Sequence, residues 1–404
     1  MCFRRLAIIV PVLTTLVFGA WQVLLGPLLA DIAREFGVDI RLAGLLLSVN
    51  FAGTLVSVMV GGYLADRYGK KRVFLAALGA FTGAILLFAT GHSFTMIAAA
   101  CLLAGGVGGS LEGLCGAVIA DCDPARRDRN LNLLQMAFSA GAVLALVLAS
   151  RLHALGLHWQ TVYFVLGCAA VPVLLLAICM RVPPAPPGEP ISLSIVRRVL
   201  THPLILLLAL AIALYVGAEM GLAQWITRLL VKAACPPATA MLAPALFWGM
   251  TGVGRLISGA LCLRYSGLRV LSWLLLGGCA AFAVLLLPPD QRTLWIGTGL
   301  AGLAFSGIWP LLVSLASSHF PSYSGTTVAL MVVASNVGGM IFPALAGFII
   351  EQQGAAASAR LWQHPSWWGI VFFALQFLAL VAVCARYVRA RTGYTVHQRV
   401  PVVE

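Results

Sequence analysis

Two carboxylates stand out because they lie deep inside apolar stretches of the sequence. Of the thirteen Asp and Glu residues, Glu112 and Glu219 have long apolar runs on both sides. A carboxylate in hydrocarbon costs about 3 kcal/mol or more, so such side chains usually face water or a polar partner. Removing a carboxyl group from water also favours its protonated form. We therefore expect one of these acids to carry a proton in function. A structural hydrogen bond to a neighbouring helix is the alternative for each.

The residues around Glu219 point to a polar solute. Tyr215 shares a helical face with Glu219, whereas Gln224 and Trp225 join that face only if the helix is broken, which the intervening glycines permit. An acid, an amide and aromatic rings suit a polyhydroxylated molecule, because polar groups bind hydroxyls and a ring covers the apolar face of a sugar. An interfacial Trp with a packing Tyr is the simpler alternative.

Glu112 lies in a glycine-rich stretch. Gly105, Gly108, Gly109 and Gly116 are spaced to share its helical face. Because these positions have no side chains, a solute or a neighbouring backbone can approach closely there. Tight helix packing alone would explain the pattern equally well.

Four further residues are weaker candidates for contact with a solute, and each would serve equally well in a hydrogen bond between helices. They are Gln22, Gln135, Trp309 and Asn336. The seven histidines fall in loops, helix ends or the C-terminal tail, and none belongs to a metal-ligand pattern. We expect no cofactor and no metal. The expected coupling ion is a proton, with sodium as the alternative.

The elements that must position these residues are membrane-spanning helices. The chain of 404 residues is 61% hydrophobic and only 10% charged, with a mean hydropathy of +0.98. Ordinary soluble domains carry about 25% charged residues, so the composition excludes a soluble enzyme, a disordered chain and a disulfide-rich secreted protein. The net charge of +13 lies in short clusters between apolar stretches. We therefore expect contact with a lipid bilayer and not with nucleic acid.

Apolar runs long enough to cross a bilayer predict twelve helices. We expect them near 6–30, 42–65, 73–90, 94–120, 131–150, 158–180, 204–230, 238–262, 268–288, 293–317, 325–350 and 366–386. A proline-rich interruption near the middle of the chain separates two sets of six. The prediction is an all-α membrane protein with an N-terminal six-helix bundle (1–182), a cytoplasmic linker (183–202), a C-terminal six-helix bundle (203–390) and a cytoplasmic tail (391–404).

The basic residues predict the orientation. With both termini cytoplasmic, most of the 26 Lys and Arg residues fall in segments on the cytoplasmic side, as the positive-inside rule requires. We expect a monomeric, multi-pass protein of the bacterial cytoplasmic (inner) membrane.

A charged motif follows the second predicted helix. It comprises Gly62, Asp66, Arg67, Gly69, Lys70 and Lys71, and a partial copy half a chain later has Leu263 in place of the acid. The glycines permit a tight turn, and the acid can pair with a base in a closed arrangement that opens during transport. The motif resembles the loop signature of the major facilitator superfamily, which implies two halves that rock about a solute site. We group Arg255, near the end of the eighth helix, with this gating motif. A solvated loop that only sets topology is the alternative.

Three stretches resemble the fucose–proton symporter family, particularly its glucose-permease branch. Residues 215–225 are similar to the helix-seven signature of that branch, 108–112 to a helix-four motif with a glutamate, and 336–343 to a helix-eleven motif. The chain departs from the family at Gly116, where an asparagine is usual, and in the first helix, where the family often has polar or acidic residues and this chain has only Trp21 and Gln22 before Asp31. The resemblance implies proton-coupled uptake of a sugar.

We therefore predict a secondary transporter, not an enzyme, that moves a small polar solute by alternating access in symport with protons, and we expect the solute to be a sugar. An exporter of drugs or metabolites by proton antiport is the alternative. The glycine- and proline-rich fifth-helix signature typical of such antiporters is missing from the sequence. An integral-membrane enzyme would need a nucleophile or His/Asp cluster at one membrane face, and the sequence shows none.

Overall fold

The computed structural model describes residues 2–122, 127–182, 201–288, 290–319, 324–352 and 365–397. Within them, twelve segments are long and apolar enough to cross a membrane. The predicted all-α architecture with twelve spans is therefore confirmed. A helix pairs its backbone amides and carbonyls within its own segment, which is what a span without access to water requires.

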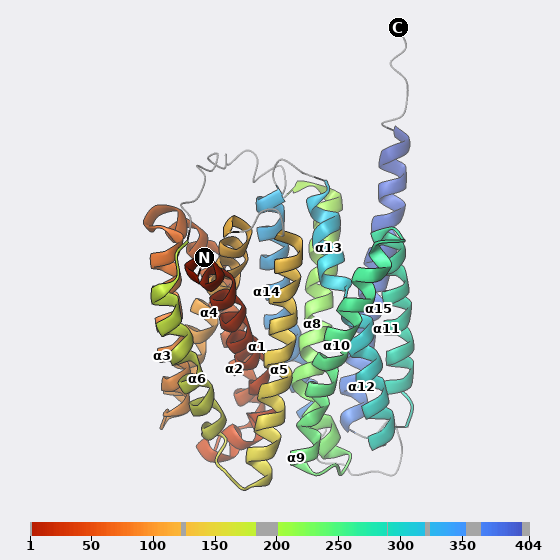
Figure 1. The fold of residues 1–404 in the computed structure, drawn as a ribbon. Helices are drawn as coiled ribbons and strands as arrows, with labels where there is room; N and C mark the ends of the chain where they lie inside the picture. Colours follow the sequence, from red (N-terminus) through yellow and green to blue (C-terminus); the bar gives the residue numbers. More distant parts are fainter. Residues whose placement is uncertain are drawn as a thin grey trace.

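In chain order, the twelve spans divide into a first six and a second six, drawn in red to yellow and in green to blue in Figure 1. The first comprises α1 (Cys2–Phe36), α2 (Ile40–Tyr68), α3 (Lys70–Ala89), α4 (Phe94–Cys122), α5 (Arg127–Ala154) and α6 (Gln160–Cys179). The second comprises α8 (Pro203–Lys232), α9 (Pro237–Ala240) with α10 (Leu242–Cys262), α11 (Gly267–Leu285), α12 (Gln291–Phe305) with α13 (Ile308–Ser317), α14 (Ser324–Gln352) and α15 (Pro365–His397). The predicted linker falls largely outside the described residues.

The beginning of α1 and the end of α15 lie at the same end of the bundle (Figure 1). We call this the terminal end. The opposite end carries α9 and the connection between α5 and α6, and we call it the far end.

The predicted tenth helix, 293–317, is two helices rather than one. α12 ends at Phe305, and α13 begins at Ile308 after Gly307. Pro310 has no amide hydrogen to pair with the carbonyl four residues earlier, and glycine weakens a helix locally. The twelfth helix also continues to His397, beyond the expected end near 386, because hydropathy marks where the membrane ends and not where the helix ends.

The charged motif lies at the turn between α2 and α3. Gly69 alone joins the two helices and has φ +88°, a conformation that favours glycine. Lys71 Nζ donates to the carbonyl oxygen of Ile178 at 3.0 Å, and Arg67 Nη1 donates to a tyrosine hydroxyl one turn earlier at 3.0 Å. The side chain of Asp66 and the surroundings of Gly62 lie outside the described residues.

Within the described residues, the two halves meet through α5 with α9 and, more extensively, through α1 with α8, α2 with α14, and α5 with α10. In the last pair, α10 packs against α5 near Gly249 and Gly252, where an added Cβ would make ordinary van der Waals contact. A Cβ atom added at Gly249 or Gly252 of α10 would lie 3.8 Å from the side chain of Val143 or 3.6 Å from that of Ser139. This close approach brings polar groups of α10 within hydrogen-bonding distance of α5.

Candidate functional site

Arg255 lies inside a membrane span at the boundary between the two halves. Its side chain extends from α10 to α5, where Nη1 donates to the carbonyl oxygen of Gln135 at 2.9 Å and to the hydroxyl of Ser139 at 3.0 Å. The hydrogen bonds of Arg255 are thus with α5 rather than with the α2–α3 turn, to which the sequence assigned it. A half-buried arginine within a span marks a functional region by default.

Both predicted acids interact with Arg255 but differ in exposure. Glu112, in α4, is exposed although it lies within a span, whereas Glu219, in α8, is only 5% exposed. The positive charge of Arg255 interacts electrostatically with both carboxyl groups. Since α4 and α10 belong to different halves, Glu112 faces the boundary between them. Water or a small solute can therefore reach charged groups within the span.

Tyr215 connects Glu219 to the break between α12 and α13. The Tyr215 hydroxyl oxygen lies 2.5 Å from Glu219 Oε1 and 2.9 Å from the carbonyl oxygen of Phe305, the last residue of α12. Tyr215 and Glu219 share one face of α8, as their spacing indicates, and both are buried. We call Glu112, Ser139, Tyr215, Glu219 and Arg255 the Arg255 cluster.

Gln224 lies further along α8 and has different partners. Its Nε2 donates to the carbonyl oxygen of Gln22 at 2.7 Å, and its Oε1 accepts from the amide of Gly26 at 2.7 Å. These backbone groups are four residues apart in α1 and would pair with each other in a regular helix, so the Gln224 amide is inserted into the other half's helix. Only glycine fits at position 26, because an added Cβ would lie 2.3 Å from Gln224 Oε1.

Two side chains extend this neutral arrangement. Asn50 Nδ2 donates to Gln22 Oε1 at 2.6 Å, and Asn50 Oδ1 accepts from Trp21 Nε1 at 3.0 Å. The sequence analysis missed Asn50, although an asparagine inside the apolar run 42–65 was an available signal. We call Trp21, Gln22, Gly26, Asn50 and Gln224 the Gln224 network. All five are buried, and they join α1 and α2 to α8 toward the far end.

The other predicted solute-binding residues have more ordinary surroundings. Trp225 is 1% exposed and donates from Nε1 to the carbonyl oxygen of Pro343 at 2.8 Å. Asn336 donates within α14, to the carbonyl oxygen of Val332 at 2.9 Å. Trp309 is half-buried in α13, and Gln135 contributes its backbone carbonyl to Arg255. In this conformation Gln224 and Trp225 are therefore occupied by protein partners.

Two further hydrogen bonds join the halves nearer the far end than the terminal end. Ser150 Oγ in α5 donates to the carbonyl oxygen of Ala238 in α9 at 2.7 Å. Ser48 Oγ in α2 donates to the carbonyl oxygen of Met340 in α14 at 2.7 Å. Together with the Gln224 network, these bonds hold the halves together at that end.

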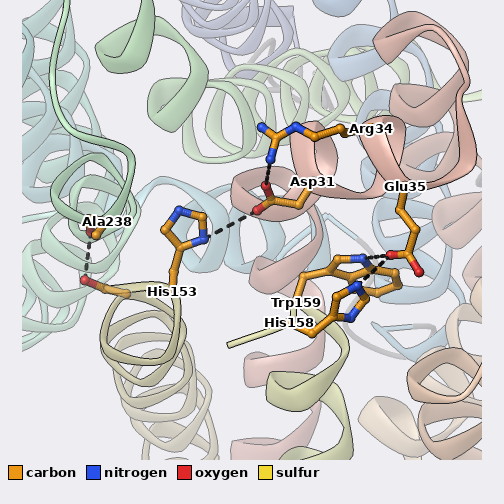
Figure 2. Close-up of polar contacts among 8 residues, drawn as sticks. Asp31, Arg34, Glu35, His153, His158, Trp159 and Ala238 are labelled. Carbon is orange, nitrogen blue, oxygen red and sulfur yellow. Dashed lines mark hydrogen bonds and ion pairs between the residues drawn. The ribbon is translucent and has the colours of Figure 1, made fainter. Parts of the chain in front are cut away.

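Acidic and histidine side chains lie beside the bond to Ala238, as Figure 2 shows. Asp31 Oδ2 lies 3.6 Å from His153 Nδ1, and Glu35 Oε2 lies 3.1 Å from His158 Nε2. All four residues belong to the first half. These pairs stabilise the junction of α1 with α5 and α6 rather than the boundary between halves.

Two aromatic rings border the Arg255 cluster. Phe138 precedes Ser139 in α5, and its ring centroid lies 5.3 Å from that of Trp248 in α10. Trp248 and Arg255 are seven residues apart and so share a face of α10, about 10 Å apart along the axis. Trp248 Nε1 is buried and has no hydrogen-bond partner among the described residues. A buried N–H without an acceptor is costly, so a bound molecule that accepts from it would be stabilised.

This arrangement suits a small organic anion with a ring. A guanidinium binds a carboxylate through a fork of N–H donors, and the neighbouring rings bury apolar surface. Within the described part of the chain, no group of three His, Cys, Asp or Glu side chains could hold a metal ion.

Comparisons with known proteins agree with this fold. The profile of the Major Facilitator Superfamily matches residues 12–291 and 230–400. The 3-(3-hydroxy-phenyl)propionate transporter of Escherichia coli K12 is 31% identical over 336 residues, which cover 78% of this chain and 79% of the relative. A TsgA homolog of Erwinia tasmaniensis is 23% identical over 90% of this chain and 92% of its own length. The crystal structure of the nucleoside transporter NupG superposes with a TM-score of 0.75 at 13% identity, covering 94% of this chain and 99% of that one.

Proposed function

Because the chain belongs to the major facilitator superfamily, we propose that it moves small organic acids across a membrane together with protons, by alternating access. The chain is an integral, multi-pass membrane protein and a transporter rather than an enzyme. The substrate class and the coupling to protons are the parts of this function that we propose.

One observation carries the proposal, which is the position of Arg255. Its guanidinium lies inside a span, bridges the two halves and interacts with the exposed Glu112. A substrate carboxylate that competes with Glu112 for Arg255 would contact both halves at once. Arg is well suited to this role because it stays charged and binds carboxylates through two parallel N–H donors.

The rings of Phe138 and Trp248 restrict the proposed substrates to organic acids that contain an aromatic ring. A molecule with its carboxylate at Arg255 and its ring toward Phe138 and Trp248 would span about the 10 Å between the two α10 positions. A hydroxyl on that ring could accept from the unpartnered Nε1 of Trp248. The relative named for 3-(3-hydroxy-phenyl)propionate supports this class, since that molecule has a carboxylate, a ring and a hydroxyl.

A sugar is the second candidate. The expectation from the sequence, and from the resemblance to fucose–proton symporters, depends on Gln224 and Trp225, whose polar groups here bind protein partners. Opening of the far end would release the side chains of Gln22, Asn50 and Gln224, and these amides could then bind hydroxyl groups. We place the sugar second because the polar groups that would bind it have protein partners here, whereas Glu112 and Arg255 are at least partly accessible.

We also propose the orientation expected from the sequence. The α2–α3 turn, with Arg67, Lys70 and Lys71, lies at the terminal end, and basic loops favour the cytoplasmic side. Both termini would then be cytoplasmic in a bacterial inner membrane. A monomer suffices for this function, because the proposed site lies between two halves of the same chain.

The experiment is an uptake screen with the purified protein in proteoliposomes that have an alkaline interior. The labelled compounds are 3-phenylpropionate, 3-(3-hydroxyphenyl)propionate, D-glucose and D-xylose. Undissociated organic acids cross bilayers unaided, so protein-free liposomes provide the baseline. We expect accumulation of the two acids above that baseline and none of the sugars. Accumulation of a sugar alone would overturn the organic-acid proposal.

A further inference from the structure

The contacts of Tyr215 specify where a proton lies. Its hydroxyl oxygen is within hydrogen-bonding distance of two oxygens, Glu219 Oε1 at 2.5 Å and the Phe305 carbonyl at 2.9 Å. A phenol has one hydrogen to donate, and a backbone carbonyl can only accept. Two short contacts therefore require a second hydrogen, and Glu219 is the group that can supply it.

The alternative, an ionised Glu219, leaves the arrangement incomplete. A carboxylate would take the phenol's only hydrogen, and the Phe305 carbonyl would lose its contact with Tyr215. Glu219 is 5% exposed and Tyr215 is fully buried, so water would not readily replace the lost bond. A buried charge without sufficient partners is also unfavourable.

The positive charge of Arg255 does not remove this requirement. Arg255 and Tyr215 are the charged or titratable groups that act on Glu219 within the described part of the chain. The Nη1 donor of Arg255 is directed to Gln135 and Ser139 in the other half. Arg255 is thus near enough to attract a carboxylate but is hydrogen-bonded to α5 in this conformation.

We propose that Glu219 is the proton-carrying acid, and that its O–H donates to Tyr215, whose own O–H donates to the Phe305 carbonyl at the break between α12 and α13. The transfer of this proton across the membrane rests on the proposed function, whereas the protonated state of Glu219 in this conformation does not. When the proton leaves Glu219 for water on the open side, the Tyr215 hydrogen turns to the carboxylate and releases Phe305. The proton is thereby linked to the position of α12 against α8.

Glu112 has a different role in this account. It is exposed, so it can exchange protons with water directly and needs no hydrogen-bonded chain. Its carboxyl group interacts electrostatically with Arg255, and a substrate anion would compete with it for that positive charge. The two acids therefore have different roles: Glu219 holds the proton, and Glu112 competes with the substrate for Arg255.

Infrared difference spectroscopy tests the protonated state without any substrate. Protein in lipid films at neutral pH should show the carbonyl stretch of a protonated carboxylic acid, shifted on exchange into D2O. Glu219→Gln should remove that band, whereas the matched variant Glu112→Gln should leave it in place. Tyr215→Phe should move the band to higher wavenumber, because the acid loses its hydrogen-bond acceptor.

The outcomes separate this inference from the proposed function. A band that survives in Glu219→Gln, or one that disappears in Glu112→Gln, would overturn the assignment to Glu219. If Glu219→Gln does not fold, an unshifted band in Tyr215→Phe would overturn the hydrogen-bonded chain. A failure of organic-acid uptake in proteoliposomes, with the band assigned to Glu219 intact, would instead count against the substrate class alone.

Discussion

The Arg255 cluster and the Gln224 network both connect the two halves, yet their chemistry is opposite. The cluster contains charges, and two of its members, Glu112 and Arg255, are at least partly accessible. The network consists of neutral groups, all buried, whose amides donate and accept within the protein. Accessible charged groups, as in the Arg255 cluster, can exchange their protein partners for a solute. Buried groups whose hydrogen bonds are all made within the protein, as in the Gln224 network, favour a single closed arrangement. We therefore propose that the Arg255 cluster binds the solute and that the Gln224 network closes the far end.

The most severe test of this division is Arg255→Ala. It removes the proposed partner of the substrate carboxylate and leaves the Gln224 network untouched. Loss of one partner of a buried charged pair costs about 2–5 kcal/mol, so uptake of 3-phenylpropionate should fall about 30-fold or more. Arg255→Lys keeps the positive charge but lacks the two parallel N–H donors of the guanidinium. Its uptake of 3-phenylpropionate should lie between that of wild type and that of Arg255→Ala. Unchanged uptake in the alanine variant would rule out the Arg255 cluster as the anion site.

Gln224→Leu tests the other region. It should weaken closure at the far end and leave unchanged which compounds are transported. The substitution removes two hydrogen bonds between the halves, each worth about 0.5–1.5 kcal/mol, so closure at the far end should weaken about 5-fold or more. Opening can be followed by the reaction of Ser48→Cys, at the boundary with α14, with a membrane-impermeant maleimide.

Gln376→Leu is the matched control for that measurement. Gln376 is an equally buried glutamine that donates to a backbone carbonyl, that of Leu214 at 3.0 Å, but both residues belong to the second half. The control should leave the maleimide rate at the level of Ser48→Cys alone. Equal acceleration by both leucine variants would mean that the Gln224 network is structural packing and not a closure.

Trp248→Phe tests the contact with the ring hydroxyl of the proposed substrate separately from the contact with its carboxylate. The variant replaces the indole with a smaller aromatic ring and removes the unpartnered N–H. Because one hydrogen bond is worth about 0.5–1.5 kcal/mol, the KM for 3-(3-hydroxyphenyl)propionate should rise about 2- to 10-fold. The KM for 3-phenylpropionate should not change. A parallel change for both acids would show that Trp248 acts through packing alone.

The smallest effect is expected for Glu112→Gln. Removing a partly solvated competitor of the substrate should strengthen anion binding by about 0.2–1 kcal/mol, a decrease in KM of up to about 5-fold. Concentration dependence of 3-phenylpropionate uptake would measure it. A large rise in KM would contradict the competing role and place Glu112 among the groups that hold the substrate.

The sequence predicts the fold well because membrane spans depend on local composition. Apolar length alone identifies all twelve spans, and the i, i+4 spacing places Tyr215 next to Glu219. From the sequence we predict a single solute site over residues 215–225, whereas in the structure these residues belong to two regions, the Arg255 cluster and the Gln224 network. Glu219 interacts with Arg255 of α10 and, through Tyr215, with α12, whereas Gln224 enters α1.

The residues that sequence analysis misjudged are those whose role depends on contact between the halves. Arg255 reads as a basic residue at a helix end, and nothing local shows that the packing of α10 against α5 places it beside Ser139. Asn50 likewise becomes informative only when α1 and α2 are packed together. The break at Gly307 was visible as a Gly and Pro pair, but only the structure shows that it presents the Phe305 carbonyl to Tyr215.

The most direct test of the whole account is proton movement driven by 3-phenylpropionate in proteoliposomes, recorded with an external pH indicator. Wild-type protein should alkalinise the medium on addition of the acid's anion, beyond the signal of protein-free liposomes. Glu219→Gln should exchange labelled for unlabelled 3-phenylpropionate without moving protons, whereas Glu112→Gln should still move both. Alkalinisation by a sugar but not by 3-phenylpropionate, or full proton movement in Glu219→Gln, would contradict the account.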